Sequence, residues 1–329
     1  MFLLATILLT VCWLPNATTK VRAIPDDANS PLESQLRQLE RDYGFELEMV
    51  GPGYKPEKKG LVIDAKPVEG DVLAYFLPMF VKEMQLYPRE LTQKAKLKRI
   101  FFCSDLYVNG VSAGGVALEQ KDTIIYSLNS EVRGYTLTQL LHNDQSAIHH
   151  EFFHIVDSRI NRNITVDAKW SELNVPGYRY GTFALNDVYE RMSTIVTNRF
   201  PGFISRYAQM NVAEDKAETF SRMMLNLHEM ECRAKDDPIL GRKIDRIKQM
   251  LQEFSPEMDE RFWTKIRNLK RPRLTLKGKE DPWADAHPIL PPLPKEIEAV
   301  PKVVEPVVVI GIEPKWILLE QPCVTIRRR

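Results

Sequence analysis

Two histidines and a glutamate at helical spacing are the residues of this 329-residue chain best suited by type and order to do chemistry. His150, Glu151 and His154 form the pattern His-Glu-x-x-His. On a helix, residues four apart lie on the same face, so both imidazoles can reach one cation. The adjacent glutamate can take a proton from a water molecule held by that cation. These residues together are the minimum needed to hydrolyse a peptide bond with zinc.

The surrounding sequence indicates that the motif lies on a helix in a domain core. The stretch from Leu137 to Ile160 contains no proline or glycine, so a helix can continue through it. Apolar residues surround the polar ones, namely Ala147, Ile148, Phe152, Phe153, Ile155 and Val156. The histidines of such a helix could simply hydrogen-bond to neighbours, but burying two of them with a glutamate is costly without a purpose.

A zinc hydrolase needs a third protein ligand and an open position for water. A histidine six residues after His154 would indicate the metzincin pattern, but that position is Ile160. Further along, Glu214 and Glu218 lie four apart in a segment expected to be helical. One carboxylate can bind zinc while the other orients a ligand histidine. Without the histidine motif, the same pair would be an ordinary solvated acidic stripe.

The order of these residues resembles a known family. The sequence His-Glu-Phe-Phe-His-Ile-Val-Asp, followed by Tyr-x6-Glu-x3-Glu-x-Phe, is similar to the catalytic domain of anthrax lethal factor and its bacterial relatives among the gluzincin metallopeptidases. It is also similar to secreted bacterial proteins called "putative zinc-binding metallopeptidases". The segment from Trp170 to Gly181 resembles that group's Trp-x-x-Leu-Asn-Pro-x-Gly-Phe-x-Tyr stretch, although Pro176 falls one position late and Tyr178 replaces Phe. The resemblance covers roughly residues 70–268, with a longer spacer between the motifs than in lethal factor.

The resemblance also implies roles for individual residues. It implies one zinc ion per chain, bound by His150, His154 and Glu214. It implies that Glu151 is the general base, that Tyr207 donates a hydrogen bond to the oxyanion, and that Glu218 supports a ligand histidine. An ordinary half-buried tyrosine is the alternative for Tyr207, in which case Tyr178 or Tyr180 would be the candidates for the oxyanion role.

Three further polar residues near the motifs have simpler expected roles. His149 points about 100° away around the helix from the ligand beside it, so we expect it to be structural. Asp157 lies one turn after His154 and could contact a ligand histidine, but a helix-end or surface position is the simpler expectation. Asp215 is turned about 100° from Glu214 and is expected to face outward.

The N-terminal sequence predicts export. Residues 2–14 form an apolar run of signal-peptide length that is too short to span a bilayer comfortably. Because the sequence up to Ala23 offers a small-residue cleavage site, residues 1–23 are expected to be a signal peptide of a protein that is secreted or lies in the periplasm or cell envelope. No Lys or Arg precedes the apolar run, so an uncleaved anchor is the alternative. No transmembrane segment is expected in the mature chain.

Composition excludes other classes of protein. A formal net charge of +1 gives no electrostatic footprint for nucleic acid, so no nucleic-acid partner is expected. The partner expected of a zinc peptidase is a protein or peptide substrate. Beyond Cys12 there are three cysteines, which is too few for a disulfide scaffold. Cys103 lies in the predicted strand at 99–103 and is expected to pack in the core. The sequence does not predict an oligomeric state.

Local signals predict an α+β domain over residues 24–270. Helices are expected from Pro31 to Tyr43, 71–84 with a kink or break at Pro78, 212–233, 238–254, and from an N-cap at Ser255 to Ile266. Strands are expected at 45–50, 99–103, 115–118 and 123–126, with a turn at 109–115. The resemblance implies that this order is a zincin-like metallopeptidase fold, with a small twisted sheet, the His-Glu-x-x-His active-site helix and a mostly helical C-terminal half. Residues 271–329 form a proline-rich tail, either disordered or partly docked through the apolar run at 303–312.

Two functions follow from these expectations. The first is a secreted zinc endopeptidase, in which the long connection at 160–206 frames the substrate cleft and an exposed strand at 123–127 pairs with the substrate backbone. The second is a non-catalytic zinc-binding protein of the cell surface that retains a zincin shell. A zinc site that has lost its catalytic activity usually lacks one ligand or the general base. Because this chain has all the candidate ligands and the base, its sequence favours the enzyme.

Overall fold

The computed structural model describes residues 31–51, 54, 56, 60–68, 72–128, 137–181 and 199–270. The first part of the chain contains α1 (Pro31–Tyr43), β1 (Glu46–Met49), β2 (Ile63–Ala65), α2 (Val72–Met84), α3 (Arg89–Ala95), β3 (Arg99–Cys103), β4 (Leu106–Val108), β5 (Val111–Ser112), β6 (Gly115–Leu118), η1 (Glu119–Lys121) and β7 (Thr123–Ser127). The described elements after them are helical: α4 (Leu137–Ile160), α5 (Ala168–Ser171), η2 (Tyr207–Gln209), α7 (Val212–Ala234), α8 (Pro238–Phe254) and α9 (Glu260–Arg267). The fold is therefore mixed, with small sheets and many helices, as the sequence predicts.

A four-stranded sheet with the order β1-β3-β7-β6 lies in the first half. Strands β1, β3 and β7 are parallel, and β6 runs antiparallel to β7. Every residue of β7 is buried, and the strand is hydrogen-bonded on both sides, to β3 and to β6. The expectation that residues 123–127 are exposed and pair with a substrate is therefore wrong. Parallel strands are normally covered on both faces, and β7 follows that rule.

The two faces of this sheet are covered differently. Ile100 and Ile124 are neighbours on the face that packs against the helices. Phe101 and Ile125, one residue further along, point to the opposite face. There they pack with the residues of the antiparallel sheet β2-β4-β5, including Val108. Cys103 belongs to this second cluster as a buried free thiol, which confirms its predicted place in the core.

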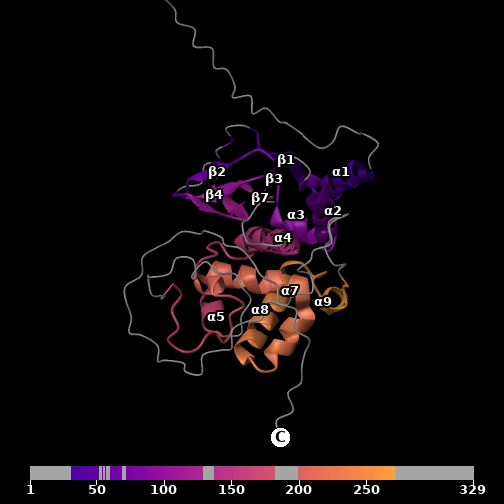
Figure 1. Ribbon diagram of the computed structural model, residues 1–329. Coiled ribbons are helices and arrows are strands. Elements are labelled where there is room, and N and C mark those ends of the chain that lie inside the picture. Colours follow the sequence, from indigo (N-terminus) through magenta and orange to yellow (C-terminus); the bar gives the residue numbers. More distant parts are fainter. Residues whose placement is uncertain are drawn as a thin grey trace, which may run out of the picture.

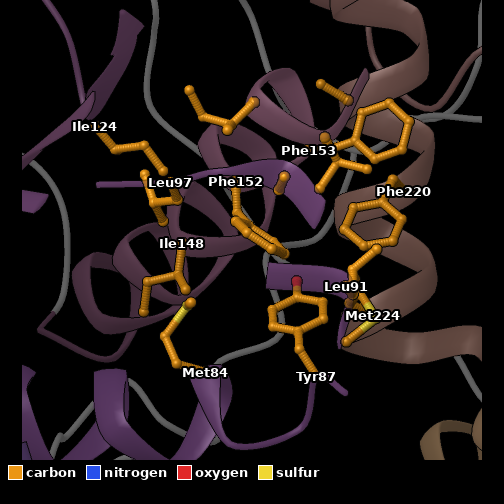
Figure 2. Close-up of a cluster of buried hydrophobic side chains, with 14 of the residues drawn as sticks. Met84, Tyr87, Leu91, Leu97, Ile124, Ile148, Phe152, Phe153, Phe220 and Met224 are labelled. Atoms are coloured by element: carbon orange, nitrogen blue, oxygen red, sulfur yellow. The ribbon is translucent and has the colours of Figure 1, made fainter. Parts of the chain in front are cut away.

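Helix α4 lies between the strands and the C-terminal helices (Figure 1). Figure 2 shows the apolar cluster around it, in which Ile148 and Phe152 of α4 lie among residues from α2, α3 and β7. Phe153 points the other way and stacks on Phe220 of α7, with 4.7 Å between ring centroids. A helix with apolar contacts on several sides belongs in a core. Each fully buried side chain of this size contributes about 1.5–3 kcal/mol to the stability of the fold.

The predicted elements agree with the structure where local signals are strong. The helix ending at Tyr43 and the one at 238–254 are confirmed. Helix α2 continues through Pro78 as one helix, so of the kink or break expected there, the break is absent. The last helix begins at Glu260 rather than after Ser255, because the side chain of Asp259 caps it and Ser255 ends α8 instead. The expected turn at 109–115 contains the short strand β5, which the sequence did not reveal.

Other expectations concern parts of the chain that are not described. The signal peptide at residues 1–23 and the proline-rich tail at 271–329 lie outside the described residues, so both stay predictions. Of the long connection, residues 161–181 and 199–206 are described. No helix in the described ranges combines the length and the apolar character needed to cross a membrane.

A buried polar network fixes α4 against α2. The ring of His149 is fully buried, with Nδ1 2.6 Å from the hydroxyl oxygen of Tyr87 and Nε2 3.0 Å from Oε2 of Glu83. Gln145, one turn earlier on α4, donates to the other carboxylate oxygen of Glu83 at 2.5 Å. His149 therefore points into the interface with α2, which confirms its predicted structural role.

Replacing Glu83 by alanine should lower the free energy of unfolding by about 2–4 kcal/mol, because the buried donors of His149 and Gln145 lose their acceptor. Glu83→Gln keeps the shape and one acceptor oxygen, so it should lose less than half as much. Urea denaturation at saturating zinc measures both. An alanine variant as stable as the glutamine variant would show that the carboxylate does not hold the helices together.

Candidate metal centre

Three predicted ligands converge between α4 and α7. His150 Nε2 lies 3.1 Å from His154 Nε2, and Glu214 Oε2 lies 3.0 Å and 3.4 Å from these two nitrogens. Atoms held by tetrahedral zinc at about 2.0–2.1 Å are about 3.3–3.4 Å apart, so the triangle is of the right size. Two imidazole nitrogens and one carboxylate oxygen are also a donor set that zinc prefers. The residues present therefore fit a zinc ion.

The start of α7 places Glu214. Asn211 caps the helix, and its side-chain oxygen accepts a hydrogen bond from the backbone N–H of Glu214 at 3.0 Å. One turn beyond the site, Ser221 of α7 donates to the backbone oxygen of Ser146 on α4 at 3.0 Å. The two serine hydroxyl oxygens are also 2.5 Å apart. These small polar residues hold the two ligand-bearing helices in one register.

Glu218 supports His150 from the side away from the other two ligands. Its Oε1 lies 3.1 Å from His150 Nδ1, and its Oε2 accepts a hydrogen bond from Ser205 at 2.6 Å. Burial raises the pKa of Glu218 to about 7, although both hydrogen bonds oppose the rise. With a proton on Nδ1 directed at Glu218, His150 presents the lone pair of Nε2 to the site, as a metal ligand requires. The contact predicted for Glu218 is present.

The charges of the site favour a cation. Burial alone would raise the pKa of Glu214, but His154 and His150 outweigh it and hold that pKa well below its usual range. Burial alone would lower the pKa of His150, but Glu214, Glu218 and Glu151 outweigh it and raise that pKa well above its usual range. Positive charge is therefore stabilised among these side chains, whether a proton or a metal ion carries it.

Glu151 lies on α4 beside its neighbour His150, under strand β6. A Cβ atom at Gly115 of β6 would come within 2.6 Å of Cγ of Glu151. Any larger residue at this point of the strand would therefore force the Glu151 side chain or the strand to shift. No sequence motif marks Gly115, and its role emerges from the packing alone.

The three candidate tyrosines occupy different places. Tyr207 is buried in η2, with its ring centroid 6.2 Å from that of His150. The hydroxyl of Tyr180 instead donates to Oδ2 of Asp215 at 2.6 Å. The ring of Tyr178 packs against Phe203, with 4.9 Å between centroids. Of the three, Tyr207 is the one whose ring the structure places in contact range of a candidate ligand.

Asp215 does not face outward, and that expectation is wrong. It is fully buried, and its Oδ2 lies 2.7 Å from Nζ of Lys243. The same oxygen accepts a hydrogen bond from the indole N–H of Trp170 at 2.8 Å and another from the Tyr180 hydroxyl at 2.6 Å. Helix α8 and the segment from Trp170 to Tyr180 cover this side of α7. Helical periodicity alone could not reveal such a cover.

Asp157 is also buried, so the expected surface position is wrong. It forms an ion pair with the fully buried Lys216 of α7, with 2.6 Å between Oδ2 and Nζ, and accepts a hydrogen bond from Asn161 at 2.7 Å. Within the described ranges, Nδ1 of His154 is buried without a hydrogen-bond partner, so Asp157 does not orient that histidine by a direct bond. Its contact with α7 helps to hold the two ligand helices together.

Sequence comparison supports the expected class. The sequence model of a family described as "Putative zinc-binding metallo-peptidase" matches residues 88–243, which include all the candidate site residues. A crystal structure of a "putative zinc-binding metallo-peptidase" from Bacteroides caccae ATCC 43185 is similar, with 14% identity and a TM-score of 0.41 over 74% of this chain and 97% of that chain. No curated protein matches the sequence. Nothing in these matches bears on the resemblance to lethal factor, which stays a prediction. Over residues 88–243 the chain is thus similar to a family described as zinc-binding metallopeptidases.

Zinc titration should separate the three acidic residues around the site. Glu214→Ala should remove most of the zinc affinity because it deletes a ligand atom. Glu218→Ala should weaken binding by about 10–100-fold through the loss of support for His150. Asp215→Asn, combined with Lys243→Met so that no buried charge is left unpaired, should bind zinc within a few fold of the wild type, since the Asp215 carboxylate faces α8 rather than the site. Competition with a chromophoric chelator measures all three, and wild-type affinity in Glu214→Ala would overturn the ligand assignment.

Gly115→Ala should displace Glu151 and lower kcat/KM for a peptide substrate by roughly 10–100-fold, as for a misplaced reacting group. Zinc affinity should change by no more than a few fold, because the three atoms nearest to the new methyl group all belong to Glu151 and not to a ligand. Gly241→Ala on α8 is the control, since its Cβ would make only an ordinary 3.6 Å contact. Equal activity of the two alanine variants would contradict the packing argument.

Proposed function

We propose that the chain is a zinc-dependent endopeptidase that holds one zinc ion through His150, His154 and Glu214. The observation that carries this proposal is the convergence of the three ligand atoms at 3.0–3.4 Å, with a carboxylate behind His150 and a second glutamate beside it. The match to a family described as zinc-binding metallopeptidases supports the same class. A structural ion-pair cluster would not need two imidazole nitrogens and a carboxylate oxygen at the spacing of zinc ligands.

A zinc ion bound there would supply a Lewis acid that polarises the scissile carbonyl and makes water more acidic. In the proposal, Glu151 accepts the proton of the attacking water and later delivers a proton to the leaving amine. Tyr207 donates its hydroxyl proton in a hydrogen bond to the carbonyl oxygen as negative charge develops there. Glu218 keeps His150 in the orientation and tautomer that a ligand requires.

The substrate class of the proposal is a protein or peptide. Secretion or a place in the cell envelope is part of the same proposal and is supported by the apolar run at residues 2–14. The alternative is a zinc-binding protein of the cell surface that does not cleave. Candidate base and ligands are all present in this chain, which supports the enzyme over that alternative.

Glu151→Gln should retain zinc and fold but lose nearly all peptide hydrolysis, because an amide cannot accept the proton of the attacking water. Cleavage of a peptide library by the wild-type chain, with a chelator and with zinc added back, provides the assay. Glu257→Gln, at an exposed position outside the site, should behave as the wild type. A wild-type chain that binds zinc yet cleaves nothing in the library would favour the non-catalytic alternative.

A further inference from the structure

The loop that carries Tyr207, residues 199–211, is attached to its surroundings at several points, including a hydrogen bond from Arg233 of α7 to the oxygen of Phe203 at 3.3 Å. Lys243 of α8 donates to the backbone oxygen of Gly202 at 2.8 Å, and the backbone N–H of Gly202 donates to Asp237, the N-cap of α8, at 2.6 Å. Ser205 donates to Glu218, the carboxylate behind the candidate ligand His150. Near the end of the loop, the oxygen of Gln209 accepts a hydrogen bond from the N–H of Gly181 at 3.0 Å. The loop backbone is therefore fixed on both sides of Tyr207.

The attachment through Lys243 is unusual because the side chain is fully buried. Its ammonium group lies 2.7 Å from Asp215 Oδ2 and 3.8 Å from the ring centroid of Phe203. A buried ion pair is costly to desolvate, and an apolar pair of similar volume is often at least as stable. A contribution to the stability of the fold therefore does not explain why a charged lysine is buried at position 243. What an apolar residue could not do is donate a hydrogen bond to the oxygen of Gly202.

The contact with Gly202 is also sterically tight. Gly202 has a φ of +82°, and a Cβ atom there would meet the side chain of Ile239 on α8. The ammonium group of Lys243 thus binds both the backbone oxygen of Gly202 and the carboxylate of Asp215. Asp215 is adjacent to the candidate ligand Glu214. One side chain links the loop that carries Tyr207 to the helical turn that holds a candidate ligand.

We propose that Lys243, held by Asp215, is a positioning residue of the peptidase reaction that fixes the loop of residues 199–211 so that Tyr207 faces the zinc site. This inference rests on the proposed function and deepens it. Trp170 and Tyr180 take part because their hydrogen bonds to Asp215 keep that carboxylate turned toward Lys243. Lys243 itself contacts neither zinc nor substrate and acts through the loop.

The variant Lys243→Met tests the proposal, with Asp215→Asn added so that no buried charge is left unpaired. The double variant should fold, bind zinc with an affinity within a few fold of the wild type, and lose kcat by roughly 10²-fold with a smaller change in KM. Lys248→Met is the matched control, because Lys248 also lies on α8 and pairs with Glu231 of α7, away from the loop. Wild-type kcat in the double variant would overturn the proposal.

A second measurement separates positioning from general structural support. In the wild-type background, Tyr207→Phe should lower kcat by roughly 10²–10³-fold. In the Lys243→Met/Asp215→Asn background the same change should cost less than about threefold, because residues that act as a unit are not additive. If Tyr207→Phe lowers kcat by the same factor in both backgrounds, Lys243 does not act through Tyr207 and the inference fails.

Hydrogen exchange distinguishes this failure from failure of the proposed function. In the double variant, the backbone amides of residues 200–210 should exchange faster than in the wild type, while the amides of α4 should exchange at the wild-type rate. In the Lys248→Met control, neither set of amides should change its exchange rate. This readout needs no activity. An inactive wild-type chain with the expected exchange would refute the peptidase but keep the anchoring of the loop. Unchanged exchange in the loop would refute the anchoring even in an active enzyme.

Discussion

The burial of three consecutive charged residues near the start of α7 is the constraint on which the site depends. A charge removed from water must find a partner, and unpaired burial costs several kcal/mol. Glu214 faces the histidines of α4, Asp215 pairs with Lys243 of α8, and Lys216 pairs with Asp157 of α4. Because neighbouring residues on a helix point about 100° apart, the three pairs fix α7 from different directions. The helix cannot rotate without leaving charges unpaired, so the candidate ligand keeps its place.

Stability and orientation come from different parts of this structure. The aromatic contacts around α4, such as the stacking of Phe153 on Phe220, supply apolar burial that tolerates small shifts. The polar contacts tolerate less, since a hydrogen bond weakens steeply when its geometry is lost. The pair of Ser146 and Ser221 sets the register of the two ligand helices, and Glu218 sets the orientation of His150. A metal site needs this second kind of contact because its ligands must hold their geometry to within about 0.5 Å.

Local signals in the sequence were enough to predict α4, α7 and most strands, because helix spacing and strand composition act over a few residues. The pairing of the candidate ligands across the chain came from the resemblance, since Glu214 and Glu218 are equivalent by spacing alone. Contacts between distant segments could not be predicted. Periodicity places Asp215 on a different face from Glu214, but it cannot tell that Trp170 and α8 cover that face. The interior position of β7 depends on strand order, which is also a long-range property.

The long connection between the two ligand helices is compatible with a well-defined site for a related reason. Loop closure entropy rises slowly with length, by about 0.6 kcal/mol for each doubling, so a long spacer costs little once the helices are held by their own contacts. The contacts of Ser146 with Ser221 and of Asp157 with Lys216 provide that hold directly between α4 and α7. The connection is then free to serve another purpose. Its described parts bind back to α7 and η2 through Tyr180 and Gly181, so changes of sequence between such anchors could alter the surroundings of the site without moving the candidate ligands.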